Sequence, residues 1–167
     1  DWELTRHLKV NAGLRYALFA VPEKNYHSLE PRLSLRWLMR DDMALKLSYA
    51  HMAHGIHLLS STNLVMPSDI WISIDKDIPV TKSNQWAVGY NYEIEKGFNL
   101  SLEGFYKQFY DIPLSVATNV PLTCIGADYG SIGEELLVSS ARGRSYGAEL
   151  LVRWLIPERL SLVGSAT

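Results

Sequence analysis

Apolar and polar side chains alternate along most of the chain, which is the period of a β-strand with one dry face. In residues 8–19, LKVNAGLRYALF, the even positions are apolar through Tyr16, whereas Lys9, Asn11, Gly13 and Arg15 occupy odd positions. The same alternation predicts further strands at Leu29–Met39, Met43–Met52, Gln85–Ile94, Phe98–Tyr110, Arg144–Ile156 and from Arg159 onward. The pattern predicts an all-β fold, an antiparallel up-and-down meander of about seven strands.

The connections between these strands are alternately short and long. The short ones are Arg40–Asp42, Glu95–Gly97 and Pro157–Glu158, and the long ones are Ala20–Ser28, Ala53–Thr81 and Ile112–Gly143. In a meander, alternate connections lie at opposite ends of the sheet, so all the long ones fall at one end. Outer-membrane barrels have this asymmetry, with short periplasmic turns and long extracellular loops.

Aromatic residues gather near both ends of the predicted strands. Those near the short turns are Trp37, Tyr92, Phe98 and Trp154, and those near the long loops are Tyr16, Tyr49, Trp86, Tyr106 and Tyr146. Two such belts with aliphatic residues between them are typical of membrane barrels, in which amphipathic rings lie at the level of the lipid headgroups. A β-sandwich with one solvated face would also show the alternation.

Composition excludes several other classes. The chain has 167 residues, 47% of them hydrophobic, and a net charge of −2, so neither disorder nor nucleic-acid binding is indicated. A self-contained eight-stranded barrel that binds a small apolar ligand suits the length and is the alternative. An outer-membrane enzyme is a further rival, but the sequence has no nucleophile-elbow motif, and we expect no catalytic residues.

Several ordered stretches carry a family likeness. They are YHSLEPRLSLRW, ALKLSYAHMAHGIHLLSS, PSDIWIS, SNQWAVGYNYEIEKGFNLSLEGFYKQFYDIP and ARGRSYGAELLVRW. Together they resemble the barrel of TonB-dependent outer-membrane receptors, and most of all the type common in Bacteroidetes. The likeness extends over nearly the whole chain.

The resemblance implies a large transmembrane β-barrel of about 22 strands with a plugged lumen, of which this chain would supply roughly a third. Residues 1–167 would be one barrel segment, without the plug domain and the barrel ends. The expected function is energy-coupled uptake of a bulky nutrient across the bacterial outer membrane: an iron chelate, haem, cobalamin or a glycan. Expected partners are the TonB complex, reached through the plug, the membrane lipid and the transported ligand. Nucleic acid, a cofactor and a resident metal are not expected.

Two groups of residues are candidates for the site. His51, His54 and His57 leave a strand toward the longest loops, and we expect them at the extracellular mouth. Imidazole binds metals and haem, although residues satisfied by their neighbours are the more frequent case. In a plugged barrel, inward charges pair with the plug or line the substrate path, and the candidates for that role are Arg32, Arg36, Glu93, Glu103 and Glu149. Gly143 and Gly147 are expected to relieve crowding in the wall.

Overall fold

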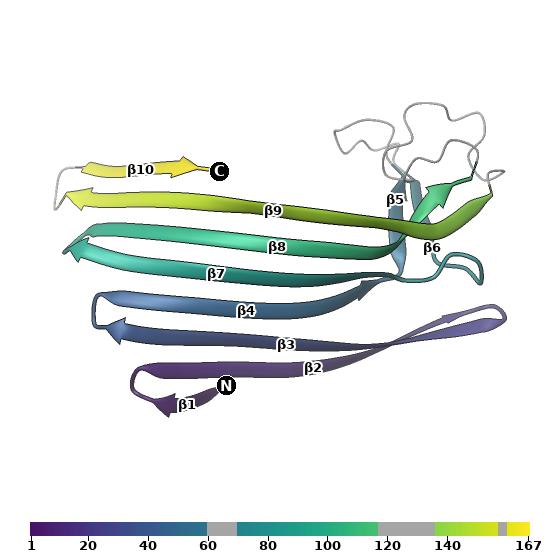
Figure 1. Cartoon of the computed structure of the whole chain (residues 1–167), viewed down its shortest axis with the longest axis horizontal. Helices are drawn as coiled ribbons and strands as arrows, with labels where there is room; N and C mark the ends of the chain where they lie inside the picture. The colour runs from purple at the N-terminus through teal and green to yellow at the C-terminus, as the bar shows by residue number, and fades with distance from the viewer. Residues whose placement is uncertain (60–69, 117–135, 157–159) are drawn as a thin grey trace.

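The computed structural model describes residues 1–59, 70–116, 136–156 and 160–167. The strands are β1 (Trp2–Thr5), β2 (Leu8–Val21), β3 (Lys24–Arg40), β4 (Met43–His54), β5 (Ile56–Leu59), β6 (Ile70–Ser73), β7 (Thr81–Glu95), β8 (Phe98–Ser115), β9 (Leu137–Ile156) and β10 (Leu160–Ala166). Eight of them form one sheet in the order β1-β2-β3-β4-β7-β8-β9-β10, and β5 pairs with β6 in a second sheet. All the pairings are antiparallel (Figure 1). The predicted all-β meander is therefore confirmed.

The sheet is open. Its outermost strands, β1 and β10, each pair with one neighbour among the described residues and not with each other. This arrangement differs from the closed cylinder of a self-contained eight-stranded barrel. Within the described residues, no helix is long and apolar enough to cross a membrane.

Tight turns join the strands at one end of the sheet, which we call the turn end. Asp41 and Asp42 connect β3 to β4, and Lys96 and Gly97 connect β7 to β8, as predicted. Gly97 adopts a φ of 90°, and an added Cβ there would lie 2.6 Å from the Leu155 carbonyl oxygen. Only glycine avoids both the strained backbone and this clash. The predicted turn at Pro157–Glu158 lies outside the described residues.

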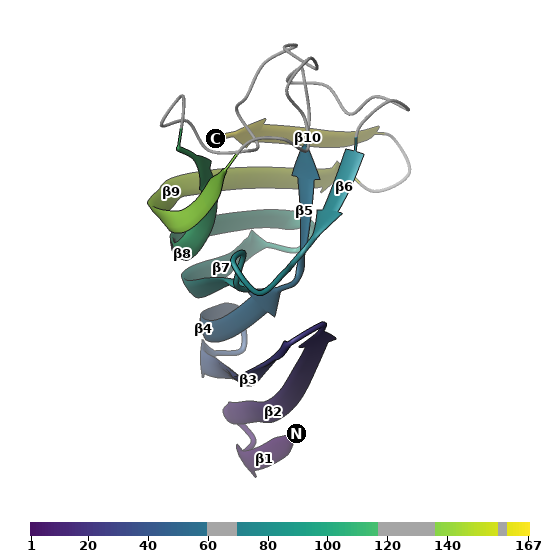
Figure 2. The same ribbon diagram turned by 90° about the vertical axis from the view of Figure 1, so that its right-hand side faces the viewer.

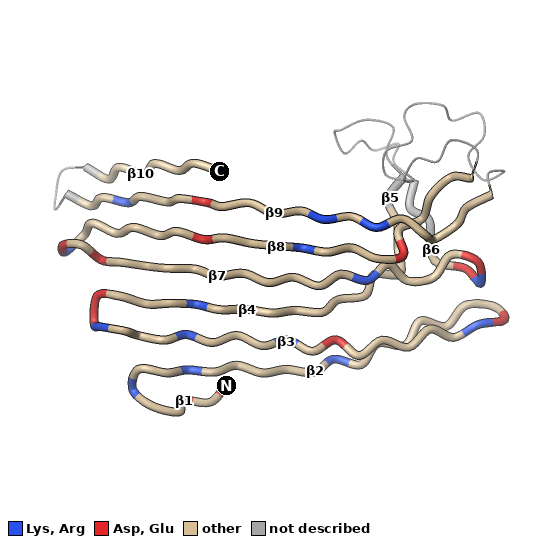
Figure 3. The backbone as a smooth tube through the Cα atoms, viewed as in Figure 1, with Lys and Arg blue, Asp and Glu red and all other residues tan. Residues whose placement is uncertain are grey.

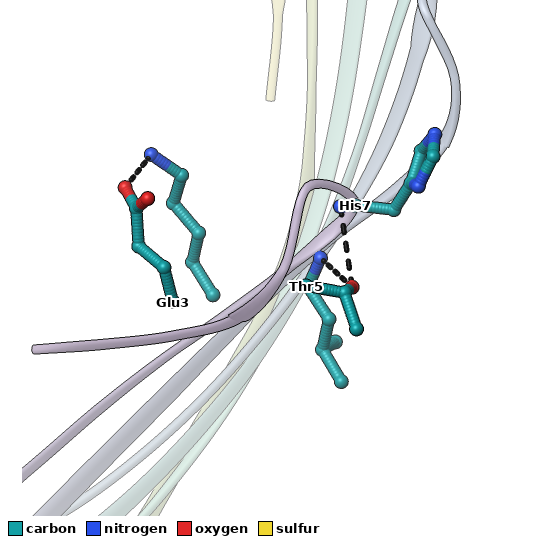
Figure 4. A network of polar contacts seen from close by, with 5 residues as sticks. Glu3, Thr5 and His7 are labelled. Atoms are coloured by element: carbon teal, nitrogen blue, oxygen red, sulfur yellow. Dashed lines mark hydrogen bonds and ion pairs between the residues drawn. The ribbon is translucent and has the colours of Figure 1, made fainter.

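A first strand and its turn were not predicted. β1 joins β2 through Arg6 and His7, and the Thr5 hydroxyl oxygen accepts hydrogen bonds from the backbone N–H groups of His7 (3.3 Å) and Leu8 (3.1 Å) (Figure 4). A side-chain acceptor of this kind stabilises a tight turn. Glu3 also forms an ion pair with Lys9 across the two strands.

At the opposite end of the sheet, which we call the loop end, three predicted long loops differ from the structure. Ala20–Ser28 is not a loop, because β2 and β3 continue to a two-residue turn at Pro22 and Glu23. The link Ala53–Thr81 contains β5 and β6, which stand side by side at this end (Figure 2). The link Ile112–Gly143 is shorter than expected, because β8 extends to Ser115 and β9 begins at Leu137.

The pairing register places the apolar residues of neighbouring strands side by side on one face, the apolar face. One row crosses it as Trp37–Leu45–Tyr90–Leu102–Leu150, and the next as Leu35–Leu47–Val88–Gly104–Ala148. Val88 and Leu102 are 46% and 47% exposed, so this face is not covered by the rest of the chain. A continuous apolar surface of this kind requires an apolar environment.

Aromatic residues border the apolar face at both ends. The aromatic row, Tyr49–Trp86–Tyr106–Tyr146, crosses β4, β7, β8 and β9 near the loop end. The ring centroids of Trp86 lie 5.6 Å from Tyr49 and 5.9 Å from Tyr106. Near the turn end, Phe98 meets Trp154 edge to face at 6.0 Å. The structure therefore aligns four of the five predicted loop-end aromatic residues in one row and joins Phe98 to Trp154 near the turn end. Tyr16, Trp37 and Tyr92 pair with aliphatic or smaller neighbours in other rows.

The other face, the polar face, carries most of the charge on the strands. Further charges lie at the turns (Figure 3). Two hollows of about 560 and 440 Å³ lie on it. Gly147 pairs with Phe105, whose ring would be 2.9 Å from an added Cβ, and Gly143 lies beside Ile112 and Phe109. Both glycines thus make room for larger neighbours in the wall, as expected.

Candidate functional site

One cross-strand row on the polar face gathers charges of both signs, and we call it the charged row. It runs Lys9–Arg36–Lys46–Gly89–Glu103–Glu149 across β2, β3, β4, β7, β8 and β9. Three of the five predicted lumen charges, Arg36, Glu103 and Glu149, belong to it. The cations occupy β2–β4 and the anions β8–β9, and Lys9 and Lys46 are members that the prediction omitted. The same strand alternation that identified Arg36 also places them on this face.

Glu103 and Glu149 face each other directly across β8 and β9. Like charges in this position repel each other. Within the described residues neither carboxylate has an ion-pair partner, and both residues are exposed. A Cβ added to Gly89 would lie 3.9 Å from Glu103 Oε2, so the carboxylate extends over the bare backbone of β7. The pair can therefore accept hydrogen bonds from a cationic group placed above the polar face.

Arg32 belongs to a second charged group nearer the loop end. Glu30 is only 1% exposed, and its Oε2 lies 3.7 Å from both Arg15 Nη1 and Arg32 Nη2. Glu30 Oε1 is buried and has no hydrogen-bond partner among the described residues. Glu30 was not predicted as a site residue from the sequence. A glutamate is rarely buried so completely unless it is paired, so its burial was not expected. Its position opposite Arg15 in the register is the signal that identifies it.

Glu93 lies apart from both groups, four residues along β7 from Gly89 toward the turn end. It pairs with Asn99, which in turn pairs with Arg153 on β9. Its backbone N–H donates to the Asp42 carbonyl oxygen at 2.9 Å and so joins β7 to the β3–β4 turn. The five predicted charges therefore share one face but not one cluster.

The three histidines are divided between the two faces. His51 lies on the apolar face beyond Tyr49, and its Nδ1 is 2.7 Å from Asn84 Oδ1. His54, on the opposite face of β4, and His57, on β5, meet edge to face with their ring centroids 6.4 Å apart. Gly55 between them breaks the strand, and that break brings the two rings together although they are three residues apart.

His57 is 8% exposed, and its Nε2 is buried without a hydrogen-bond partner among the described residues. Burial, and in second place the charge of His54, lowers the pKa of His57 below its ordinary value. The ring is therefore neutral at pH 7 and retains a nitrogen that can accept a proton or bind a metal. Among the described residues, no group of three or more His, Cys, Asp or Glu side chains could hold a metal ion.

Contacts between distant segments hold this part of the loop end in place. Tyr26 on β3 donates its hydroxyl hydrogen bond to the carbonyl oxygens of Asp75 (2.8 Å) and Lys76 (3.0 Å). The Phe19 ring lies against Gly55, where an added Cβ would be 2.8 Å from it. Ile74 and Val80 are buried. The histidine pair thus sits beside a small packed region that joins β2, β3 and the segment before β7.

Comparison with known proteins agrees with this geometry. No curated protein matches the chain in sequence. The family model described as TonB dependent receptor-like, beta-barrel, matches residues 1–167. Proteins of this family are receptors and transporters of the bacterial outer membrane rather than enzymes. A segment of such a wall requires an open antiparallel sheet with one charged face and one face that is free of charge between its aromatic borders, and the chain belongs to the TonB-dependent receptor β-barrel family.

Proposed function

We propose that the chain forms part of the wall of a plugged barrel that imports a bulky nutrient with energy supplied through TonB. The substrate classes are an iron chelate, haem, cobalamin or a glycan. The division between the two faces supports the proposal most directly. One face is apolar for lipid, and the other carries the charges that a hydrated path needs.

Uptake by the full-length receptor tests this proposal. Cells that lack their own receptors would express it, and accumulation of a labelled ferric chelate, haem, cobalamin and an oligosaccharide would be measured separately. We expect one class to accumulate, and only while the inner membrane is energised. Accumulation that persists after an uncoupler is added, or accumulation of none of the four classes, would contradict the proposal.

We further propose that the charged row contacts the plug domain. Glu103 and Glu149 repel each other unless a cation lies between them, and an arginine or lysine of the plug would remove this repulsion. Arg36 at the cationic end of the row suits an acidic plug residue. Arg32, with Glu30, lies nearer the mouth and suits either the plug or the substrate path, whereas Glu93 suits plug contacts near the turn end.

A paired substitution tests the contact with the plug. In the full-length receptor, Glu103→Gln with Glu149→Gln removes both charges and keeps the size of the side chains. We expect the plug to be cleaved faster by added protease and the barrel to admit a small polar antibiotic more readily. Glu95→Gln, an exposed carboxylate at the β7–β8 turn, is the matched control and should leave both measurements unchanged. Equal behaviour of the two variants would remove the plug contact.

We also propose that His54 and His57 contact the substrate at the mouth, while His51 remains with Asn84 on the apolar face. The position of the His54–His57 ring pair at the loop end supports this assignment, and among the described residues His57 Nε2 has no hydrogen-bond partner. Haem titration of the full-length receptor, followed by its absorption spectrum, is the test. An imidazole ligand predicts a spectral change that is lost in His57→Ala and retained in His51→Ala. If the wild type shows no spectral change, the histidines are not haem ligands.

A further inference from the structure

Three basic side chains lie on the apolar face just beyond the aromatic row, and we call them the cationic patch. They are Lys82 on β7 and Arg142 and Arg144 on β9. Arg144 pairs with Gln108 and lies two residues beyond Tyr146, while Lys82 pairs with Tyr110 and lies four residues beyond Trp86. Both arginines are exposed, and the Lys82 side chain is 42% exposed.

The position of the patch follows a sharp boundary in charge. From the aromatic row to the Phe98–Trp154 pair, the apolar-face positions of the described strands include no Asp, Glu, Lys or Arg. That interval extends from Phe98 to Tyr106 on β8, eight residue steps or about 27 Å along the strand, which suits a tilted crossing of the hydrocarbon layer. The patch therefore begins where the hydrocarbon ends.

Contacts along the strands connect the patch to the aromatic row. Gln108 Nε2 donates to the Tyr106 hydroxyl oxygen at 3.0 Å, and the Tyr110 hydroxyl donates to Gln108 Oε1. The Arg142 guanidinium lies over the Tyr110 ring, 6.0 Å from its centroid. These contacts hold the Arg142 guanidinium beside the polar groups of Gln108 and Tyr110, which extend from the aromatic row toward the loop end.

The patch retains unbalanced positive charge. Lys82 Nζ lies 3.7 Å from Asp111 Oδ2, which offsets one of the three cations. Within the described part of the chain, neither Arg142 nor Arg144 has a carboxylate partner. Two guanidinium groups two residues apart on one face of β9 can both reach the oxygens of one phosphate.

From these observations we infer that the cationic patch binds the phosphate of an anionic lipid headgroup in the outer leaflet. The acyl chains of that lipid lie against the apolar face below, and the aromatic row separates the two zones. Arginine suits this role because its planar donors form forked hydrogen bonds with phosphate. The inference rests on the family membership and the apolar face, and it does not depend on the uptake proposed above.

Lipid retention by the full-length receptor tests the inference. The purified protein in non-ionic detergent would be titrated with lipid A, and with the same lipid after removal of its phosphates, and bound lipid would be counted by native mass spectrometry. Removal of two interfacial charges in Arg142→Gln with Arg144→Gln should weaken binding of the phosphorylated lipid about 30-fold. The double Arg→Lys variant keeps the charge and should remain much closer to the wild type.

The matched control removes the same net charge from the polar face. It combines Lys107→Gln with Arg153→Gln and should bind the lipid as the wild type does, once all variants are shown to insert into the outer membrane equally. Equal lipid binding by the wild type and the Arg142→Gln, Arg144→Gln variant would overturn the inference. So would equal binding of the two lipids, or an equal loss in the control. A receptor that fails to import any nutrient would leave the expected lipid binding intact.

Discussion

Leu150 and Leu151 are neighbours on β9 that face opposite sides of the wall, and replacing each by arginine separates the two environments. Leu150 pairs with Leu102 in an apolar row, whereas Leu151 pairs with Ser101 on the polar face. The two leucines are 39% and 38% exposed in the chain, so the rest of the chain buries both side chains to the same extent. Any large difference between the two variants must come from what surrounds the complete wall.

The structure sets the size of that difference. Leu150 lies four residues from Trp154 and four from Tyr146, or about 13 Å along the strand from each aromatic border. An arginine at the middle of the hydrocarbon layer costs about 2–4 kcal/mol. Leu151→Arg places the same charge in a polar lumen and should cost within about 1 kcal/mol, as most surface substitutions do.

The assay is denaturant unfolding of the full-length receptor in phospholipid vesicles. The folded fraction is followed by its altered gel migration without heating, and the free energy of unfolding is extrapolated linearly to zero denaturant. We expect Leu150→Arg to lose at least about 1–2 kcal/mol more than Leu151→Arg. If Leu151→Arg costs as much as Leu150→Arg, or more, the assignment of lipid and lumen to the two faces is wrong.

Three further predictions concern the turn end and the loop end. Gly97→Ala should cost about 1–3 kcal/mol in unfolding free energy, because φ is positive there and Leu155 is too close, whereas Gly13→Ala, with open space around it, should be nearly neutral. Thr5→Val removes the acceptor from two backbone N–H groups at an exposed turn and should lower stability by about 0.5–1 kcal/mol in the same titration. Burial, and in second place His54, lowers the pKa of His57 below 6.5 in the folded protein. As the pH falls, His57 therefore takes up a proton more readily in the unfolded chain than in the folded one. The folded state has its full stability above pH 6.5 and loses stability as the pH drops through the lowered pKa. Amide exchange of β5, corrected for intrinsic rates, should therefore speed up from about pH 7.5 to about pH 5 in the wild type and not in His57→Phe.

The sequence alone predicted the parts of the fold in which one face of each strand must be apolar. Where one face of a strand must be apolar, the alternation is strict, so the central strands, their faces and the turn at Gly97 were all predictable. Beyond the aromatic row this constraint ends. The extension of β2 and β3 to Pro22 and Glu23, and the short strands β5 and β6, therefore carry no comparable signal.

The candidate site was predicted in part for the same reason. Alternation alone assigned Arg36, Glu103 and Glu149 to one face, but only the pairing register places them in one row. The meeting of His54 and His57 depends on the break at Gly55, and the burial of Glu30 depends on contacts between strands. Both arise from tertiary packing that no local pattern encodes.

The division of the charged row has a consequence for anything that moves along the wall. Lys9 on β2 and Glu149 on β9 are five strand spacings apart, or about 24 Å, and the sign of the charge reverses between them. This row by itself therefore carries a dipole directed around the circumference of the wall rather than along its axis. A solute with opposite charges at its two ends would experience a torque and turn broadside to its direction of travel.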